Sequence, residues 1–297
     1  MPRVNLNIKS PSGRSIKFHG KPVILYGEPP VPPPPPGPPV PTANYFQLTN
    51  RGNACKLAIY SATAGQAFVN DVYLMDIPVA STIYDSTIID IPAGAVVKLS
   101  TIKPMNNDQR PLFGDVSGYL GDLSIDRFNE QVTNYEYGIS DWNAQFTSLK
   151  AITSWAGAHT ATTFKDGFNS AGLVSLPSSW VGLTSLTSLW GAFNGCEYLA
   201  AIPDSWEGLE NVTSTGHAFQ DCHSLRTGGD SGYSSLAKVD NTECMFYGWA
   251  GVMRWTGHSY DLYNYLANKS IRVTSYRNTF TNCTSSVGYS SIPSSWK

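Results

Sequence analysis

Hydrophobic and polar positions follow two patterns along the chain. In the first half, apolar residues alternate with polar ones, as Cys55, Leu57 and Ile59 do. A period of two is typical of strands with one buried face. The predicted strands are YFQLTN, ACKLAIYS, DVYLMDI, STIIDI and AGAVVKLS, separated by turn residues such as NRGN and PAG. We therefore predict a small β-sandwich domain over residues 43–104, with Cys55 in its core.

The N-terminal segment alternates in the same way. Val4, Leu6 and Ile8 fall on one face, and the turn PSGR leads to a second alternating stretch and the run PVILY. This pattern predicts a β-hairpin with a third short strand, forming a module over residues 1–27. Such a module is too small to be stable alone in water. We expect it to complete a sheet on a partner protein or on other copies of the chain.

Residues 28–42, EPPVPPPPPGPPVPT, contain ten prolines. Proline fixes φ and removes the backbone donor, so the segment favours polyproline II. We interpret it as a semi-rigid linker about 40 Å long, at about 3.1 Å per residue. Recognition by a proline-binding domain is the alternative, but the flanking basic residue typical of such ligands is missing nearby.

The second half repeats itself with a period near 26 residues. Pro177 and Pro203 are 26 residues apart, and so are Trp180 and Trp206. Five phenylalanines mark successive repeats: Phe168, Phe193, Phe219, Phe246 and Phe280. A unit of this length cannot bury its apolar face alone, so equivalent residues must stack on one another. We predict a solenoid over residues 161–297, which begins after a junction or entry cap at residues 105–160.

Cysteines follow three of these phenylalanines by three residues, at Cys196, Cys222 and Cys283. The odd total of five and the wide spacing argue against a disulfide framework. We interpret the three as small apolar filler beneath the phenylalanines. A disulfide between Cys196 and Cys222 is the alternative if stacked repeats approach closely.

The pattern F-x-G-C-x-x-L-x-x-IP-x-S-W-x-x-L, as in FNGCEYLAAIPDSWEGL, resembles the BspA-like leucine-rich repeat family. The resemblance covers roughly residues 160–297 and is weaker over residues 43–104. It lapses at residues 226–238 and 250–272, where the leucine pattern is lost. The family implies a solenoid with an adhesive or protein-binding use, and it implies no catalytic residue.

The step from Phe246 to Phe280 is eight residues longer than the basic period. This insertion is rich in Tyr, Trp and Arg, which are enriched in binding hot spots. One interpretation is a contact surface for a glycan or a protein, and the other is a cap on the exposed end of the solenoid. The candidate surface residues are Tyr247, Trp249, Arg254, Trp255, His258, Tyr260, Tyr263 and Tyr265.

Composition and charge narrow the function. Charged residues make up only 14% of the chain, and the net charge is −2. Residues 1–42 nevertheless carry a net charge of +4. They form a basic arm that could bind an acidic protein surface. Its basic residues are Arg3, Lys9, Arg14, Lys17 and Lys21. They are too few, with too few aromatics among them, for nucleic-acid binding. No segment has a signal-peptide pattern or the apolar length of a membrane span.

The sequence shows no constellation typical of catalysis. Cys222 and His223 are adjacent, but Cys222 occupies a repeat position and is better explained as structural. Asp115, Asp122 and Asp126 do not have the spacing of an EF-hand loop, and no Cys-x-x-Cys pair predicts zinc. We expect no cofactor, no metal and no enzymatic activity.

Together these patterns predict a mainly β protein with some α structure: a hairpin module, a polyproline linker, a β-sandwich and a leucine-rich-repeat-like solenoid. The order of anchor, spacer and display domain favours a bacteriophage virion accessory protein, such as a head fibre, decoration protein or tail adhesin. Its arm would bind capsid, portal or tail proteins, and its solenoid a host glycan or surface protein. The alternatives are a bacterial cell-surface adhesin and a carbohydrate-active enzyme on a β-solenoid.

Overall fold

The structure is a computed structural model that describes residues 37–80, 85–105, 111–140, 145–248 and 253–297. The chain divides into two compact units, Met1–Gly37 and Pro38–Lys297. The predicted hairpin module, its five basic residues and most of the proline linker lie outside the described residues. The second unit contains every element described below.

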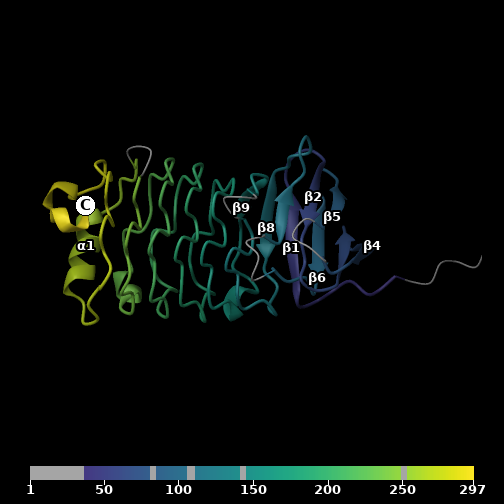
Figure 1. Ribbon diagram of the computed structural model, residues 1–297, viewed down its shortest axis with the longest axis horizontal. Coiled ribbons are helices and arrows are strands. Elements are labelled where there is room, and N and C mark those ends of the chain that lie inside the picture. Colours follow the sequence, from purple (N-terminus) through teal and green to yellow (C-terminus); the bar gives the residue numbers. More distant parts are fainter. Residues whose placement is uncertain (1–36, 81–84, 106–110, 141–144, 249–252) are drawn as a thin grey trace, which may run out of the picture. The chain divides into compact units, whose positions relative to one another are not determined.

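Among the described residues of the second unit, nine strands form two sheets (Figure 1). The six-stranded sheet has the order β4-β3-β6-β1-β8-β9, and the three-stranded sheet has the order β5-β2-β7. All pairs are antiparallel except β8 with β9. The strands are β1 Tyr45–Asn50, β2 Cys55–Ile59, β3 Gly65–Val69, β4 Val72–Ile77, β5 Thr87–Ile91, β6 Val96–Ser100, β7 Phe113–Asp115, β8 Leu123–Arg127 and β9 Leu149–Ile152.

The alternating pattern places one face of each central strand in the core. In β1, Phe46 and Leu48 are buried and pair with Leu99 and Val97 of β6. Asn50 ends the strand, and its buried side-chain amide donates to the carbonyl oxygens of Asn53, Ile91 and Pro92. These bonds satisfy a buried polar group and tie the ends of three segments together.

The two sheets share one core. Phe46 of β1 packs edge-on against Phe113 of β7, with ring centroids 5.5 Å apart. The sheets do not end at residue 104, where the sequence placed the domain boundary. β7 and β8 lie beyond it, within the predicted junction, and pair with β2 and β1. The alternating pattern is too short in β7, at three residues, to mark that strand.

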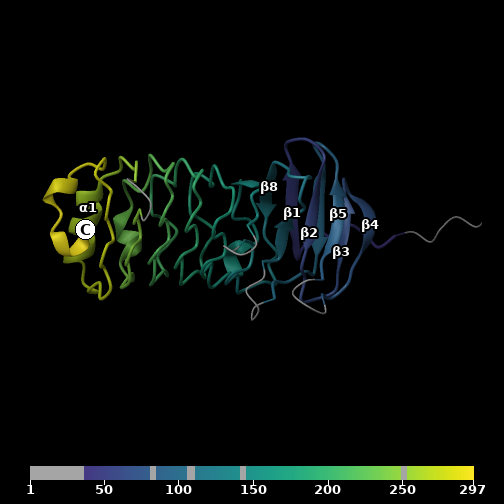
Figure 2. The same ribbon diagram turned by 45° about the horizontal axis from the view of Figure 1, so that its top comes forward.

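After β8 the chain runs through successive circuits, which we call coils, and each coil lies against the next (Figures 1 and 2). Parallel bridges join equivalent positions of neighbouring coils. One column of bridged positions consists of Asn134, Thr163, Ser188, Ser214, Asn241 and Ser275. Backbone bonds continue the pattern, since Phe168, Phe193 and Phe219 each donate an N–H to the next coil at 2.9 Å. The first of these bridges already joins the predicted junction to the coils.

Aromatic rings stack inside the coils at the predicted repeat positions. Phe168 and Phe193 are 5.4 Å apart at 6°, and Phe193 and Phe219 are 5.6 Å apart at 4°. Beside them, the indole of Trp206 stacks on Trp180 at 6.3 Å and 5°. All five rings are fully buried. The expectation of a mainly β protein with some α structure is confirmed at that level, and the described residues contain little helix.

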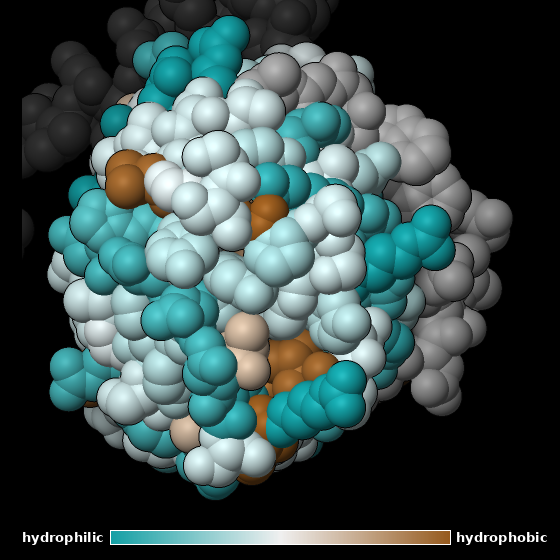
Figure 3. Space-filling view, turned by 90° about the vertical axis from the view of Figure 1, so that its left-hand side faces the viewer, coloured by the Kyte–Doolittle hydropathy of each residue, from teal (hydrophilic) through white to brown (hydrophobic). Residues whose placement is uncertain are grey.

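The last coil is covered by the long insertion and by the end of the chain. The insertion forms α1, Ser259–Asn268, the one α-helix among the described residues, and it buries Leu262 and Leu266. The Phe280 N–H, which would otherwise face a further coil, donates to the Trp296 carbonyl oxygen at 3.0 Å. The surface at this end is largely polar, with separate hydrophobic spots (Figure 3). Short 3-10 helices occur at Ala158–Thr160, Tyr233–Leu236, Tyr289–Ser291 and Ser294–Trp296.

Candidate binding groove

The aromatic insertion does not form one exposed surface. Trp255 is fully buried: its indole stacks on Phe246 at 4.2 Å and 4°, and its N–H donates to the Gly228 carbonyl oxygen at 3.0 Å. The prediction that Trp255 lies on a binding surface is therefore wrong. The insertion breaks the repeat register, so sequence alone did not reveal that this ring occupies the core.

Two tyrosines of α1 also pack inward. Tyr263 contacts Trp296 edge-on at 5.3 Å, and Tyr265 stacks on Tyr233 at 6.1 Å. Both are half-buried against the core. Their contacts fix α1 across the last coil, which favours the cap over the contact surface as the role of this insertion.

The remaining candidates of the insertion are more accessible but dispersed. Arg254, His258 and Tyr260 are exposed, and Tyr247 is half-buried. His258 lies 3.2 Å from Asp261 in the first turn of α1. Trp249 lies outside the described residues. No described cavity is lined by any of these four accessible side chains.

The repeat cysteines are reduced and buried. Each thiol donates to the carbonyl oxygen of the phenylalanine one coil earlier: Cys196 to Phe168, Cys222 to Phe193 and Cys283 to Phe246, all at 3.1 Å. A thiol suits this position because it is small and its S–H is a weak hydrogen-bond donor.

Burial raises the pKa of Cys196 to about 12 and raises the pKa of Cys222 well above its ordinary value. A nucleophilic cysteine needs an accessible thiolate. Cys222 offers neither accessibility nor a stable thiolate, so its neighbour His223 does not activate a catalytic thiol in this arrangement.

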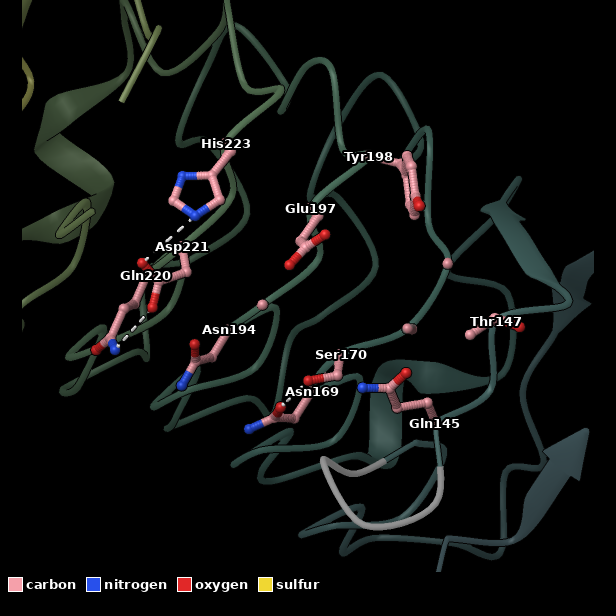
Figure 4. Close-up of a pocket in the computed structure, with 13 residues that line it drawn as sticks. Gln145, Thr147, Asn169, Ser170, Asn194, Glu197, Tyr198, Gln220, Asp221 and His223 are labelled. Carbon is pink, nitrogen blue, oxygen red and sulfur yellow. Dashed lines mark hydrogen bonds and ion pairs between the residues drawn. The ribbon is translucent and has the colours of Figure 1, made fainter. Parts of the chain in front are cut away.

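A polar groove of about 650 Å³ crosses several coils (Figure 4). Asn169, Asn194 and Gln220 line it at equivalent positions, each one residue after a stacked phenylalanine. Glu197 and Tyr198 project into it from the opposite side, as the close-up shows. The groove is completed by Gln145, Thr147, Ser170, Ala171, Gly172, Gly195, Asp221 and His223. It is thus built from repeated polar positions.

A left-handed turn shapes each step of this groove. Ser170, Gly195 and Asp221 stand two residues after their phenylalanines and have φ values of 55°, 70° and 56°. Small polar residues and glycine adopt this conformation most readily. The N–H groups of all three donate to the next coil, Ser170 to the Asn194 carbonyl at 2.7 Å, which fixes the groove wall in place.

Small residues form the base of the groove and leave it open. Ala171 is buried, and a side chain at Gly172 would meet the Thr147 carbonyl oxygen at 2.1 Å. Any larger residue at position 172 would therefore push the two coils apart. The wall carries the polar side chains, while the base brings the backbones close together.

Hydrogen bonds and ion pairs organise one end of the groove. The Gln220 amide oxygen accepts a hydrogen bond from His217 Nδ1 at 2.6 Å, and the Gln220 amide N–H donates to Asp221 at 3.2 Å. His223 lies 3.8 Å from Asp221. At the middle of the groove, Asn194 and Glu197 make no side-chain hydrogen bond to any residue that the structure describes. Their polar groups are available to a ligand.

The sequence alone did not predict this groove. Its signal was present, because the residue after each of three phenylalanines is Asn, Asn or Gln. The repeat was aligned on its apolar residues, and nothing in that alignment showed which polar positions share one hollow. Aromatic content instead directed attention to the insertion.

Comparison of the chain with models of known protein families, with curated proteins and with solved structures gives no match. Within the described part of the chain, no three His, Cys, Asp or Glu side chains are grouped as metal ligands would be. None of the described helices has the length and apolar character needed to cross a membrane.

Proposed function

We propose that this chain is a non-enzymatic display protein, an accessory protein of a bacteriophage virion. Residues 1–42 attach it to a capsid, portal or tail protein, and the coils carry a binding surface. The observation that carries the proposal is the groove, because it is built from equivalent positions of neighbouring coils. Extended surfaces of this kind are how stacked-repeat proteins bind their partners.

The repeats are proposed to be a solenoid of the BspA-like leucine-rich type, preceded by a β-sandwich. Support comes from the parallel bridges between coils and from the buried leucines of each unit, among them Leu173, Leu199 and Leu225. A solenoid needs closed ends, since a bare last coil exposes backbone groups and apolar rings. α1 and the Trp296 carbonyl supply such an end.

A carbohydrate-active enzyme is the second candidate, and one observation favours it. Two carboxylates, Glu197 and Asp221, line the same groove. Glycoside hydrolysis uses such a pair, with a separation that depends on the stereochemical outcome. Release of reducing ends from a bound glycan would establish this candidate and overturn the non-enzymatic proposal.

Localisation tests the proposal directly. An antibody against the full chain is used to probe purified virus particles, the cell envelope and the soluble fraction of the source culture. We expect the chain to sediment with the particles. Recovery in the envelope fraction of uninfected cells would instead establish a cell-surface adhesin.

If the arm attaches the chain to the particle, removing its positive charges should weaken particle association. Replacing Arg3, Lys9, Arg14, Lys17 and Lys21 by Gln removes five charges from the basic arm. We expect particle association to fall about tenfold or more, because five surface charge contacts each contribute a fraction of a kcal/mol. Cosedimentation with particles measures the change. The matched control is Asn194→Ala, in the groove, which leaves particle association unchanged. Equal binding by the two variants would contradict an attachment role for the arm.

A further inference from the structure

The groove presents one amide side chain per coil. Asn169, Asn194 and Gln220 follow one another across three coils. The stacked rings beneath them, at Phe168, Phe193 and Phe219, are 5.4 and 5.6 Å apart. Parallel bridged segments lie about 4.8 Å apart. A ligand that matches this row must therefore repeat its own polar groups at a similar step.

The side chains of the groove both donate and accept hydrogen bonds. An amide offers two donors and an acceptor oxygen, and a carboxylate offers acceptors. Asn194 is half-buried and Glu197 is exposed, and neither is bonded to another described side chain. Sugar hydroxyls also donate and accept at the same atom, so they complement a mixed row of amides and carboxylates.

An aromatic ring stands beside this polar row. The side chain of Tyr198 is 59% exposed, which leaves one ring face open to the groove. Lys150 lies beside this ring, with Nζ 5.9 Å from the ring centroid. The flat C–H face of a sugar ring packs against such a face, because it is apolar and carries partial positive charge that the π-system attracts.

The negative charge of the groove argues against an acidic ligand. Two carboxylates, Glu197 and Asp221, line the groove, and the one lysine that lies beside it, Lys150 at the ring of Tyr198, does not balance both. A nucleic acid or a uronic acid polymer would therefore meet more carboxylates than cations. Peptide recognition usually depends on apolar anchors seated in pockets. Apart from Tyr198, the residues lining this groove are small or polar, so it provides no such pocket.

We propose that the groove binds a neutral, linear glycan that lies across the coils, with about one sugar unit per coil and one ring on Tyr198. This inference rests on the proposed display function and names its ligand class. Asn169, Asn194 and Gln220 bond the hydroxyls along one edge of the glycan. Glu197 accepts hydrogen bonds from the other edge.

Calorimetric titration of the full chain with neutral oligosaccharides tests the proposal. The probes are β-linked glucose, mannose and N-acetylglucosamine oligomers of two to six units, with oligogalacturonate as the anionic comparison. We expect affinity for at least one neutral series to rise with length and to level off at about four units, when the groove is filled. Oligogalacturonate should not bind.

Variants locate the binding site. Tyr198→Ala should weaken binding about tenfold, Asn194→Ala about fivefold, and Tyr198→Phe should bind like the parent chain because the ring face is kept. The matched control is Tyr260→Ala, which removes an exposed tyrosine on α1 outside the groove. Its affinity should not change.

The outcomes separate this inference from the proposed function. A chain that sediments with particles but binds no neutral oligomer overturns the glycan inference and leaves the display function standing. Preferential binding of oligogalacturonate, or of a protein partner stripped of glycans, overturns it as well. Equal losses in Tyr198→Ala and Tyr260→Ala would place the ligand elsewhere. Glycan binding by a chain found only in the soluble fraction would instead overturn the virion proposal alone.

Discussion

Trp255→Ala will lower the free energy of unfolding by about 3–5 kcal/mol, the range for truncating a large buried aromatic. The indole is fully buried against Phe246 and Phe280, with centroids at 4.2 and 6.5 Å. Alanine leaves a cavity beside these rings. It also leaves the Gly228 carbonyl oxygen without the indole N–H that it accepts at 3.0 Å. Loss of a buried partner adds to the cost of the cavity.

Urea unfolding followed by circular dichroism measures this change, and Arg254→Ala is the matched control. Arg254 is adjacent in sequence but exposed, so its replacement should change the unfolding free energy by no more than about 0.5 kcal/mol. Because stacked repeats depend on nearest neighbours, the loss should be felt first in the last coils. Hydrogen exchange in α1 should accelerate before exchange in β1 does.

Two results would contradict this account of the insertion. If Trp255→Ala kept its stability but lost binding to particles or cells, Trp255 would belong to a contact surface. If both variants lost stability equally, the exposed side chain at position 254 would carry packing that the structure does not give it. If the insertion is a cap, Trp255→Ala should lose much stability and Arg254→Ala should not.

Local patterns predicted those parts of the fold in which burial and periodicity agree. β1 alternates over six residues, and its sequence prediction matches the observed bounds. β3 was missed because its sequence, GQAFV, begins with a residue that usually breaks strands. Gly65 is required there because a Cβ would meet the Ser100 carbonyl oxygen at 2.4 Å. That constraint comes from β6, far along the chain, and no local pattern contains it.

The same limit explains why the sequence did not predict the groove. A fixed period identified the stacked residues, since apolar residues must coincide in every coil to be buried together. Polar positions are not constrained in this way, and the direction in which they point depends on the left-handed turn at Ser170, Gly195 and Asp221. Within the insertion the period itself is lost. Trp255 and Arg254 therefore looked equivalent as surface candidates, although only Arg254 is exposed.

Stability should also fall steeply in alkali, because burial raises the pKa of the thiols in the cysteine positions of the coils. For Cys196 the folded pKa is about 12, whereas the ordinary value is 9.0. Burial moves Cys222 and Cys283 in the same direction. The folded chain thus keeps these protons above pH 9, while the unfolded chain releases them. Unfolding then releases protons, so its free energy decreases as pH rises.

The expected slope follows from the number of thiols. Each contributes about 1.4 kcal/mol per pH unit once the unfolded thiol is ionised, so these three together approach about 4 kcal/mol per pH unit. Burial also raises the pKa of Cys55 and Cys244, which add to the slope. Their contribution is complete below pH 9 and is lost as pH rises toward 12. Tyr135, whose pKa burial also raises, adds to the loss above pH 10. The interval from pH 9 to 10 therefore reports mainly on thiols.

Urea titrations at pH 8, 9 and 10 under reducing conditions measure this slope. Cys196→Ala removes one titrating group and the bond to the Phe168 carbonyl oxygen. It should cost about 1 kcal/mol at pH 8 and reduce the alkaline slope by about 1.4 kcal/mol per pH unit, because one titrating thiol is gone. Lys297→Ala, which keeps every thiol, should leave the slope unchanged. A flat profile between pH 9 and 10, or an undiminished slope in Cys196→Ala, would mean that the thiols ionise in the folded chain. The buried S–H bonds to the phenylalanine carbonyls would then not be the arrangement that these residues adopt.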